Sequence, residues 1–132
     1  MQRRNLSPNP IKQLMDFLGS IKVSHKMAWF LLFLAITFEI SGTVSMKLSH
    51  GFTRTVPTIL MFVFYISGFV PLNLALRQID ISVAYAIWSG LGTAVIAMIG
   101  IFAFREPITL LRALSIVLII FGVIGLNISH WR

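Results

Sequence analysis

Cysteine is absent from this 132-residue sequence, which excludes disulfide bonds and thiolate metal sites. Charged residues are scarce as well: they make up 11% of the chain, whereas a soluble domain carries about 25%. The three histidines are scattered at the ends of predicted helices, so they do not supply the converging ligands of a metal site. We therefore predict neither a metal nor a cofactor, and the low charge indicates a membrane protein.

Long uncharged stretches dominate what is present. Between charged residues the chain holds four stretches of 19 to 24 residues, one of them interrupted by a single acid, and a membrane-spanning helix needs roughly 20 apolar residues. We predict an all-α membrane protein with transmembrane helices at about residues 27–47, 56–76, 81–104 and 110–129. The four-residue connection 77–80 predicts that the second and third of these helices are antiparallel neighbours. Because four helices hardly enclose a ligand cavity, we expect an oligomer.

The formal net charge of +7 is distributed at the ends of the predicted spans. This placement is typical of membrane topology and forms no stripe for phosphates, so we predict no nucleic-acid partner. Residues 1–26 form a separate basic extension, before a transmembrane domain at residues 27–132. Asn9-Pro10 is a helix-start signal, and apolar residues follow at helical spacing. The extension is interpreted either as an amphipathic helix on an anionic membrane surface or as disordered.

One acid interrupts the first uncharged stretch. Glu39 lies among uncharged and mostly apolar residues, where a carboxylate is costly and is read as functional by default. Helical spacing places the small residues Ala35, Gly42 and Thr43 on the same face, which allows another helix to approach closely. Because burial disfavours a charged carboxylate, we expect Glu39 to bind and release a proton.

Three aromatic residues, Tyr65, Tyr85 and Trp88, are predicted at the same membrane depth as Glu39. Aromatic ring faces attract positive charge and a carboxylate supplies the counter-charge, so together they predict a site for a lipophilic cation. A site that holds either a proton or a cation exchanges one for the other, and alternate exposure to the two membrane faces would let a proton gradient drive export. The competing hypothesis is a non-transporting membrane assembly subunit in which Glu39 only holds helices together.

Several segments also resemble a known family. They are Glu39-Ile40-Ser41-Gly42-Thr43 with Met46-Lys47, Gly51-Phe52-Thr53-Arg54 with Pro57, and Ala84-Tyr85-Ala86-Ile87-Trp88-Ser89-Gly90-Leu91-Gly92. In order and spacing, over about residues 27–130, they resemble the small multidrug resistance (SMR) transporters of the EmrE type. The resemblance implies a multi-pass protein of the bacterial inner membrane that is not an enzyme.

The resemblance further implies a proton-coupled antiporter that exports lipophilic or quaternary ammonium cations by alternating access. The functional unit would be an antiparallel, dual-topology homodimer, in which proton and substrate compete for one membrane-embedded glutamate per subunit, here Glu39. The third transmembrane helix would bend at Gly90 to Gly92, where the two glycines also allow tight packing. The substrate-lining positions that it implies are Ala35, Ile36, Thr43, Tyr65, Phe69, Tyr85, Trp88 and Ser89.

The subtype is less narrowly defined. Gly42 stands where the guanidinium-exporting branch carries a bulky aromatic residue, which favours the multidrug branch. A polyamine or guanidinium exporter subunit, as one half of a heterodimer with a paralogue, is the alternative. Pro71 and Asn73 depart from the family pattern and would alter substrate range. The extension is unusual for the family, so Met27 is an alternative start position.

Overall fold

The computed structural model describes residues 9–129, so residues 1–8 of the predicted extension and residues 130–132 lie outside the described range. Within this range the chain forms five helices: α1 (Pro10–Ser20), α2 (His25–Leu48), α3 (Thr55–Ala75), α4 (Ile81–Phe104) and α5 (Leu110–Ser129). The last four lie within two residues of the ranges expected from the uncharged stretches. The predicted all-α class is confirmed.

Three of these helices, α2, α3 and α4, are long and apolar enough to cross a membrane. Helix α5 contains the apolar stretch Leu110–Gly125. By length and composition, the described chain therefore contains three or four candidate membrane-spanning helices.

The segment before the first span is helical where the structure describes it. The Asn9 side chain accepts a hydrogen bond of 3.0 Å from the Ile11 amide, and Pro10 occupies the first helical position, where its missing N–H is no loss. Four residues then connect α1 to α2, whose start is capped by Ser24. Residues 10–20 of this segment thus form a helix, whereas its location on an anionic membrane surface stays a prediction.

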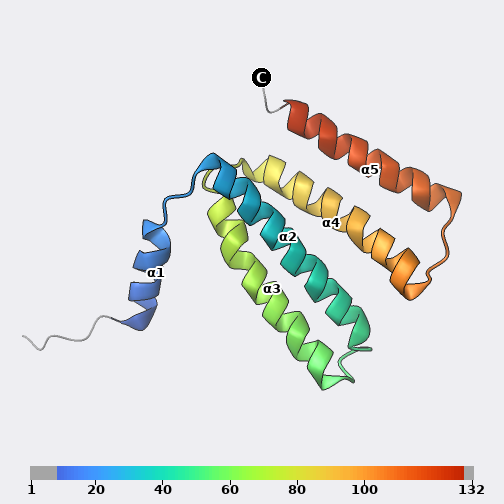
Figure 1. Cartoon of the computed structure of the whole chain (residues 1–132), viewed down its shortest axis with the longest axis horizontal. Coiled ribbons are helices and arrows are strands. Elements are labelled where there is room, and N and C mark those ends of the chain that lie inside the picture. Colours follow the sequence, from blue (N-terminus) through green and yellow to red (C-terminus); the bar gives the residue numbers. More distant parts are fainter. Residues whose placement is uncertain (1–8, 130–132) are drawn as a thin grey trace, which may run out of the picture.

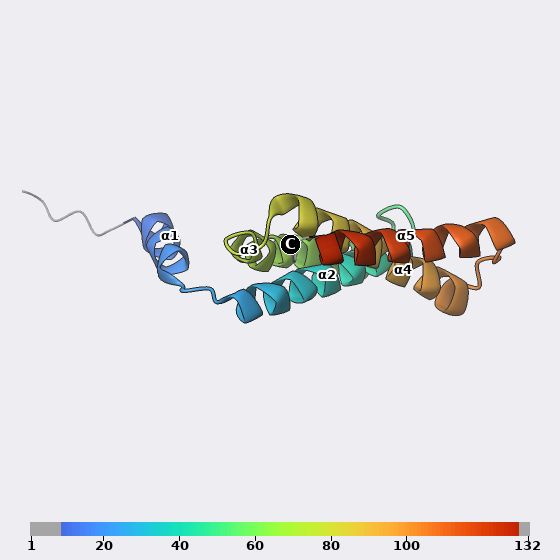
Figure 2. The same ribbon diagram turned by 90° about the horizontal axis from the view of Figure 1, so that it is seen from above.

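The helices are arranged around α2, which packs against α3 on one side and α4 on the other, while α5 packs against α4 (Figure 1). Seen from above, α2 to α5 form an elongated bundle, and α1 lies outside it (Figure 2). The prediction that α3 and α4 are antiparallel neighbours is right for their direction (Figure 1) but wrong for their contact: their extensive contacts are with α2 and, for α4, with α5. The short connection joins the ends of α3 and α4 but does not bring their lengths together.

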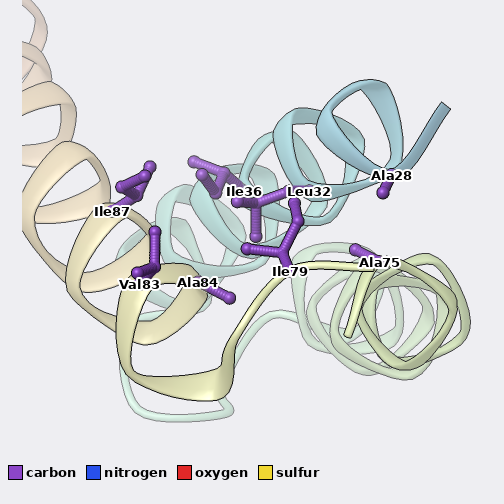
Figure 3. Packing of buried hydrophobic residues seen from close by; sticks show 8 residues of the cluster. All are labelled: Ala28, Leu32, Ile36, Ala75, Ile79, Val83, Ala84 and Ile87. Atoms are coloured by element: carbon purple, nitrogen blue, oxygen red, sulfur yellow. The ribbon is translucent and has the colours of Figure 1, made fainter. Parts of the chain in front are cut away.

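Buried apolar side chains at the start of α2 explain this divergence. Ile79, in the connection between α3 and α4, is 3% exposed and reaches toward Leu32 of α2 (Figure 3). Because these side chains are close-packed, α2 lies between α3 and α4 and keeps them apart along most of their length. The cluster consists of Ala28, Leu32, Ile36, Ala75, Ile79, Val83, Ala84 and Ile87.

The glycines of α4 lie at close contacts with neighbouring groups. A β-carbon on Gly90 would overlap the Val123 side chain of α5, so the absence of a side chain lets these two helices approach closely. Helix α4 runs without interruption through Gly90 and Gly92. Tight packing is thus shown for Gly90, whereas the bend at Gly90 to Gly92 stays a prediction.

Charged residues connect three helices at the opposite end of the bundle. Arg105 adopts a left-handed conformation with φ of 53°, and the Glu106 amide donates to the Gly100 carbonyl at 3.0 Å, which ends α4. The Glu106 carboxylate lies 2.8 Å from Arg112 of α5 and 3.4 Å from Lys47 of α2. Hydrogen bonds from Arg112 and then Lys47 lower the pKa of Glu106 below its ordinary value of 4.5.

Candidate functional site

Glu39 lies on α2 at the level where the helix faces both α3 and α4. Its Oε1 atom accepts a hydrogen bond of 3.2 Å from the Thr43 hydroxyl, one turn further along α2. The Thr43 hydroxyl is also 3.0 Å from the Tyr65 hydroxyl of α3. Because Thr43 has a single hydroxyl hydrogen and gives it to Glu39, Tyr65 must donate to Thr43. The result is a relay of donors from Tyr65 through Thr43 to the carboxylate.

The second oxygen of this carboxylate has a different environment. Among residues 9–129, Oε2 of Glu39 is buried and has no hydrogen-bond partner. A buried polar atom without a partner is costly, so a proton or a hydrogen-bond donor placed at this oxygen would be stabilised. Gly92 of α4 provides the space, since a β-carbon there would lie only 3.1 Å from Oε2.

Two cavities meet at the carboxylate. The first, of about 230 Å³, lies between α2, α3 and α4 and is lined by Ala35, Glu39, Tyr65, Gly68, Phe69, Leu72 and Trp88. The second, of about 210 Å³, is lined by Glu39, Trp88, Ser89, Gly92 and Thr93. Glu39 and Trp88 belong to both cavities, so a ligand in either one lies beside the carboxylate and an indole ring.

Most of the sequence-predicted site residues are brought together here. Two are placed differently within the protomer. Ile36 is 2% exposed and packs in the core cluster, away from both cavities, because it points toward the Leu32 side of α2. Tyr85 is 63% exposed, with its ring centroid 5.5 Å from that of Trp88. The residues that line a cavity or join the relay are Ala35, Glu39, Thr43, Tyr65, Phe69, Trp88 and Ser89.

The sequence-based site list missed three cavity residues: Gly68, Leu72 and Thr93. Gly68 and Leu72 are one and two turns from Tyr65, so helical spacing alone places them on the same face of α3. Thr93 adjoins Gly92 and carries no distinguishing signal in the sequence. Of the departures from the family pattern, Pro71 is buried and Asn73 is exposed, and neither lines a cavity with Glu39.

Comparison with known proteins identifies the family of this chain. The family described as Small Multidrug Resistance protein matches residues 27–119, which include the carboxylate, the relay and the cavity residues. The chain belongs to the small multidrug resistance family. The resemblance stated from its motifs is therefore confirmed, and with it a multi-pass membrane protein of a bacterial transporter family that is not an enzyme.

Three relatives show the range of this family. The uncharacterized membrane protein YvaE of Bacillus subtilis (strain 168) is 49% identical over 102 residues, which cover 77% of this chain and 86% of the relative. The multidrug resistance protein EbrB of the same organism is 44% identical, covering 73% and 82%. A guanidinium exporter of Proteus vulgaris is 39% identical, covering 78% and 99%. The protein is thus an SMR exporter whose relatives include both multidrug and guanidinium transporters.

Proposed function

We propose that this SMR protein is a proton-coupled antiporter that exports lipophilic or quaternary ammonium cations. The observation that carries the proposal is the asymmetry of the Glu39 carboxylate. One oxygen is held by the hydroxyl relay, while the other is buried, without a partner, beside cavities lined by aromatic rings. Its free oxygen is therefore positioned to meet a positive charge, and no residue among 9–129 forms a hydrogen bond with it.

The chemistry of exchange follows from the competition for that oxygen. A proton on Oε2 neutralises the carboxylate, and a lipophilic cation against the Trp88 ring does the same by charge attraction. The two cannot neutralise one carboxylate together, so cation binding releases a proton. The relay stabilises the ionised form, which accepts a hydrogen bond from Thr43. Alternate opening to the two membrane faces then turns competition into antiport.

The active unit that we propose is an antiparallel homodimer. The cavity lies where α3 and α4 diverge. Phe69 in its wall is 67% exposed, and Tyr85, whose ring lies beside that of Trp88, is 63% exposed. A cation site open to lipid on one side is not sealed, whereas a second copy of the chain would supply the missing wall and a second Glu39. The alternative is a heterodimer with a paralogue.

The size of the residue at position 42 supports the multidrug subtype. A β-carbon on Gly42 would lie 3.1 Å from two ring carbons of Tyr65, so only glycine lets this ring approach α2 without displacement. A bulky residue there would push Tyr65 out of the relay and reduce the cavity. The apolar, aromatic cavity suits a large lipophilic cation better than guanidinium, which requires several hydrogen-bond acceptors. The alternative function is that of a guanidinium exporter, as in the relative from Proteus vulgaris, or of a polyamine exporter subunit.

Proton release measures this proposal directly. Tetraphenylphosphonium is added to weakly buffered, purified protein, and protons are counted for the native chain, Glu39→Gln and Glu106→Gln. We expect release from the native chain and from Glu106→Gln, which removes a carboxylate elsewhere, but none from Glu39→Gln. Equal release from Glu39→Gln would show that Glu39 is not the coupling group.

Guanidinium, tested in parallel, separates the subtypes. Release with guanidinium and not with tetraphenylphosphonium would replace the multidrug subtype by the guanidinium subtype. No release with either cation, nor with a polyamine, would favour the non-transporting assembly subunit.

A further inference from the structure

Helix α1 presents large apolar side chains that no part of residues 9–129 covers. Ile11, Leu14, Met15 and Phe17 are each 57% to 66% exposed. Lys12, Gln13 and Asp16 lie on the opposite side of the helix, so the apolar residues form one continuous face. An 11-residue helix gains little from backbone propensity alone, and such a face has to be covered for the helix to persist.

Arg77 attaches this helix to the transmembrane bundle. Its guanidinium donates hydrogen bonds to the carbonyls of Leu18 at 3.2 Å, Ile21 at 3.1 Å and Gly19 at 3.5 Å. Carbonyls in the last turn of a helix have no partner within the helix, and a cation there is favoured by the helix dipole. Since Arg77 follows the end of α3, α1 is held at the membrane face where α3 ends and α2 begins (Figure 1).

A cavity of about 440 Å³ lies between the end of α1 and α3. Leu18 of α1 and Arg77 contribute to its wall. The other lining residues lie in the last two turns of α3 or directly after it, and all of them except Asn73 are apolar: Phe69, Val70, Leu72, Asn73, Leu74 and Leu76. An apolar cavity of this kind at a membrane face, open beside an uncovered apolar helix, fits a hydrocarbon chain.

The charge around α1 favours an anionic lipid surface. From residue 9 to residue 26 there are three lysines, Lys12, Lys22 and Lys26, and one acid, Asp16, which gives a net charge of 3 − 1 = +2. A second protein copy with the same basic segment would be repelled, whereas an anionic leaflet attracts it over about one Debye length, roughly 8 Å at physiological salt. Arg77, which holds α1, lies in the connection between the candidate spans α3 and α4, so α1 is already placed at the bilayer surface.

We propose that α1 binds the surface of an anionic phospholipid leaflet, with its apolar face among the acyl chains and a lipid chain in the cavity beside Leu18. Arg77 keeps the helix at the α3–α4 connection, so that the bundle and the surface helix meet the membrane together. The family match begins at residue 27, so this attachment is an addition to the shared transport domain. The proposal does not depend on the transported substrate.

The chain offers a clean test because it has no cysteine. Single cysteines replace Leu14 on the apolar face or Gln13 on the polar face, and each is labelled with an environment-sensitive fluorophore. Both residues are exposed in the protein, so without a membrane the two labels should be in equally polar environments. In vesicles of phosphatidylcholine and phosphatidylglycerol, we expect lipids spin-labelled near the headgroup to quench the label at Leu14 several-fold more than the label at Gln13.

Equal quenching at the two positions would overturn the proposal. Shielding of the Leu14 label without quenching, together with disulfides between copies of the Leu14→Cys chain, would also overturn it and identify a second copy as the occupant. Circular dichroism verifies that each labelled variant keeps its helix content.

The anionic requirement is tested with the same label at Leu14. We expect its insertion to increase with phosphatidylglycerol content and to decrease at high salt. Replacing Lys12, Lys22 and Lys26 by glutamine should weaken insertion by up to about fivefold per lysine. Insertion that is the same in pure phosphatidylcholine, and unchanged by the three replacements, would refute an anionic partner. None of these readouts involves cation transport, so a failure here is distinct from a failure of the antiport proposal.

Discussion

The hydroxyl relay leads to a prediction about how two side chains act together. Among the residues that the structure describes, Thr43 has the only hydroxyl that donates to Glu39, and Thr43→Val removes it while preserving the shape of the side chain. Tyr65→Phe removes the outer donor of the relay and keeps the ring, and therefore keeps any attraction between that ring and a cation. The two single variants and the double variant form a double-mutant cycle for cation binding.

The magnitudes follow from the type of each hydrogen bond. A bond to a charged group contributes about 1.5–3 kcal/mol, so Thr43→Val should weaken tetraphenylphosphonium binding by roughly 10-fold or more. A bond between neutral hydroxyls contributes about 1 kcal/mol, so Tyr65→Phe should weaken it about fivefold. Because Tyr65 acts on Glu39 only through Thr43, the double variant should bind no more weakly than Thr43→Val.

Isothermal titration of the detergent-solubilised protein with tetraphenylphosphonium measures all four dissociation constants at one pH. Ser41→Ala is the matched control: its hydroxyl belongs to the same helix but donates to the Thr37 backbone carbonyl, not to Glu39. It should bind as the native chain does. Losses that add in the double variant would refute the relay, since additivity means that Tyr65 and Thr43 act on the cation independently.

Four further predictions concern other parts of the molecule. Gly92→Ala places a methyl group against the Glu39 carboxylate and should weaken cation binding, measured by titration calorimetry, without changing the helix content. Gly90→Ala overpacks the contact with α5 and should lower the free energy of unfolding by about 1–3 kcal/mol, measured by denaturation followed by circular dichroism.

Arg77→Lys keeps the charge but loses the planar guanidinium, so trypsin should cleave the α1–α2 connection faster, as seen by mass spectrometry; an unchanged rate would contradict the attachment of α1. Glu106 has a lowered pKa in the folded state, so its pairing with Arg112 and Lys47 stabilises the protein above pH 4.5. This contribution is lost as the pH falls through the lowered pKa of Glu106. The melting temperatures of the native chain and of Glu106→Gln should therefore converge in acid. Single cysteines labelled from each membrane side should report both orientations, while N-termini that are all cytoplasmic would exclude the antiparallel homodimer.

Several properties of this protein were readable from its sequence alone. The helix ranges follow from uncharged stretches of the length of a bilayer, a property of each segment by itself. Glu39 stood out because the cost of a carboxylate at membrane depth depends on its immediate surroundings and not on the fold. Asn9 and Pro10 likewise predicted the start of α1 from local capping alone.

The tertiary structure decided which helices meet and how each is rotated. Helical spacing groups residues on one face but does not say what that face contacts, so Ile36 was expected at the site and instead packs in the core. The relay requires the hydroxyls of Thr43 and Tyr65, 22 residues apart, to come within 3.0 Å. The attachment of α1 joins Arg77 to carbonyls 56 to 59 residues earlier. Such contacts depend on how side chains of different helices interlock, which no local pattern encodes.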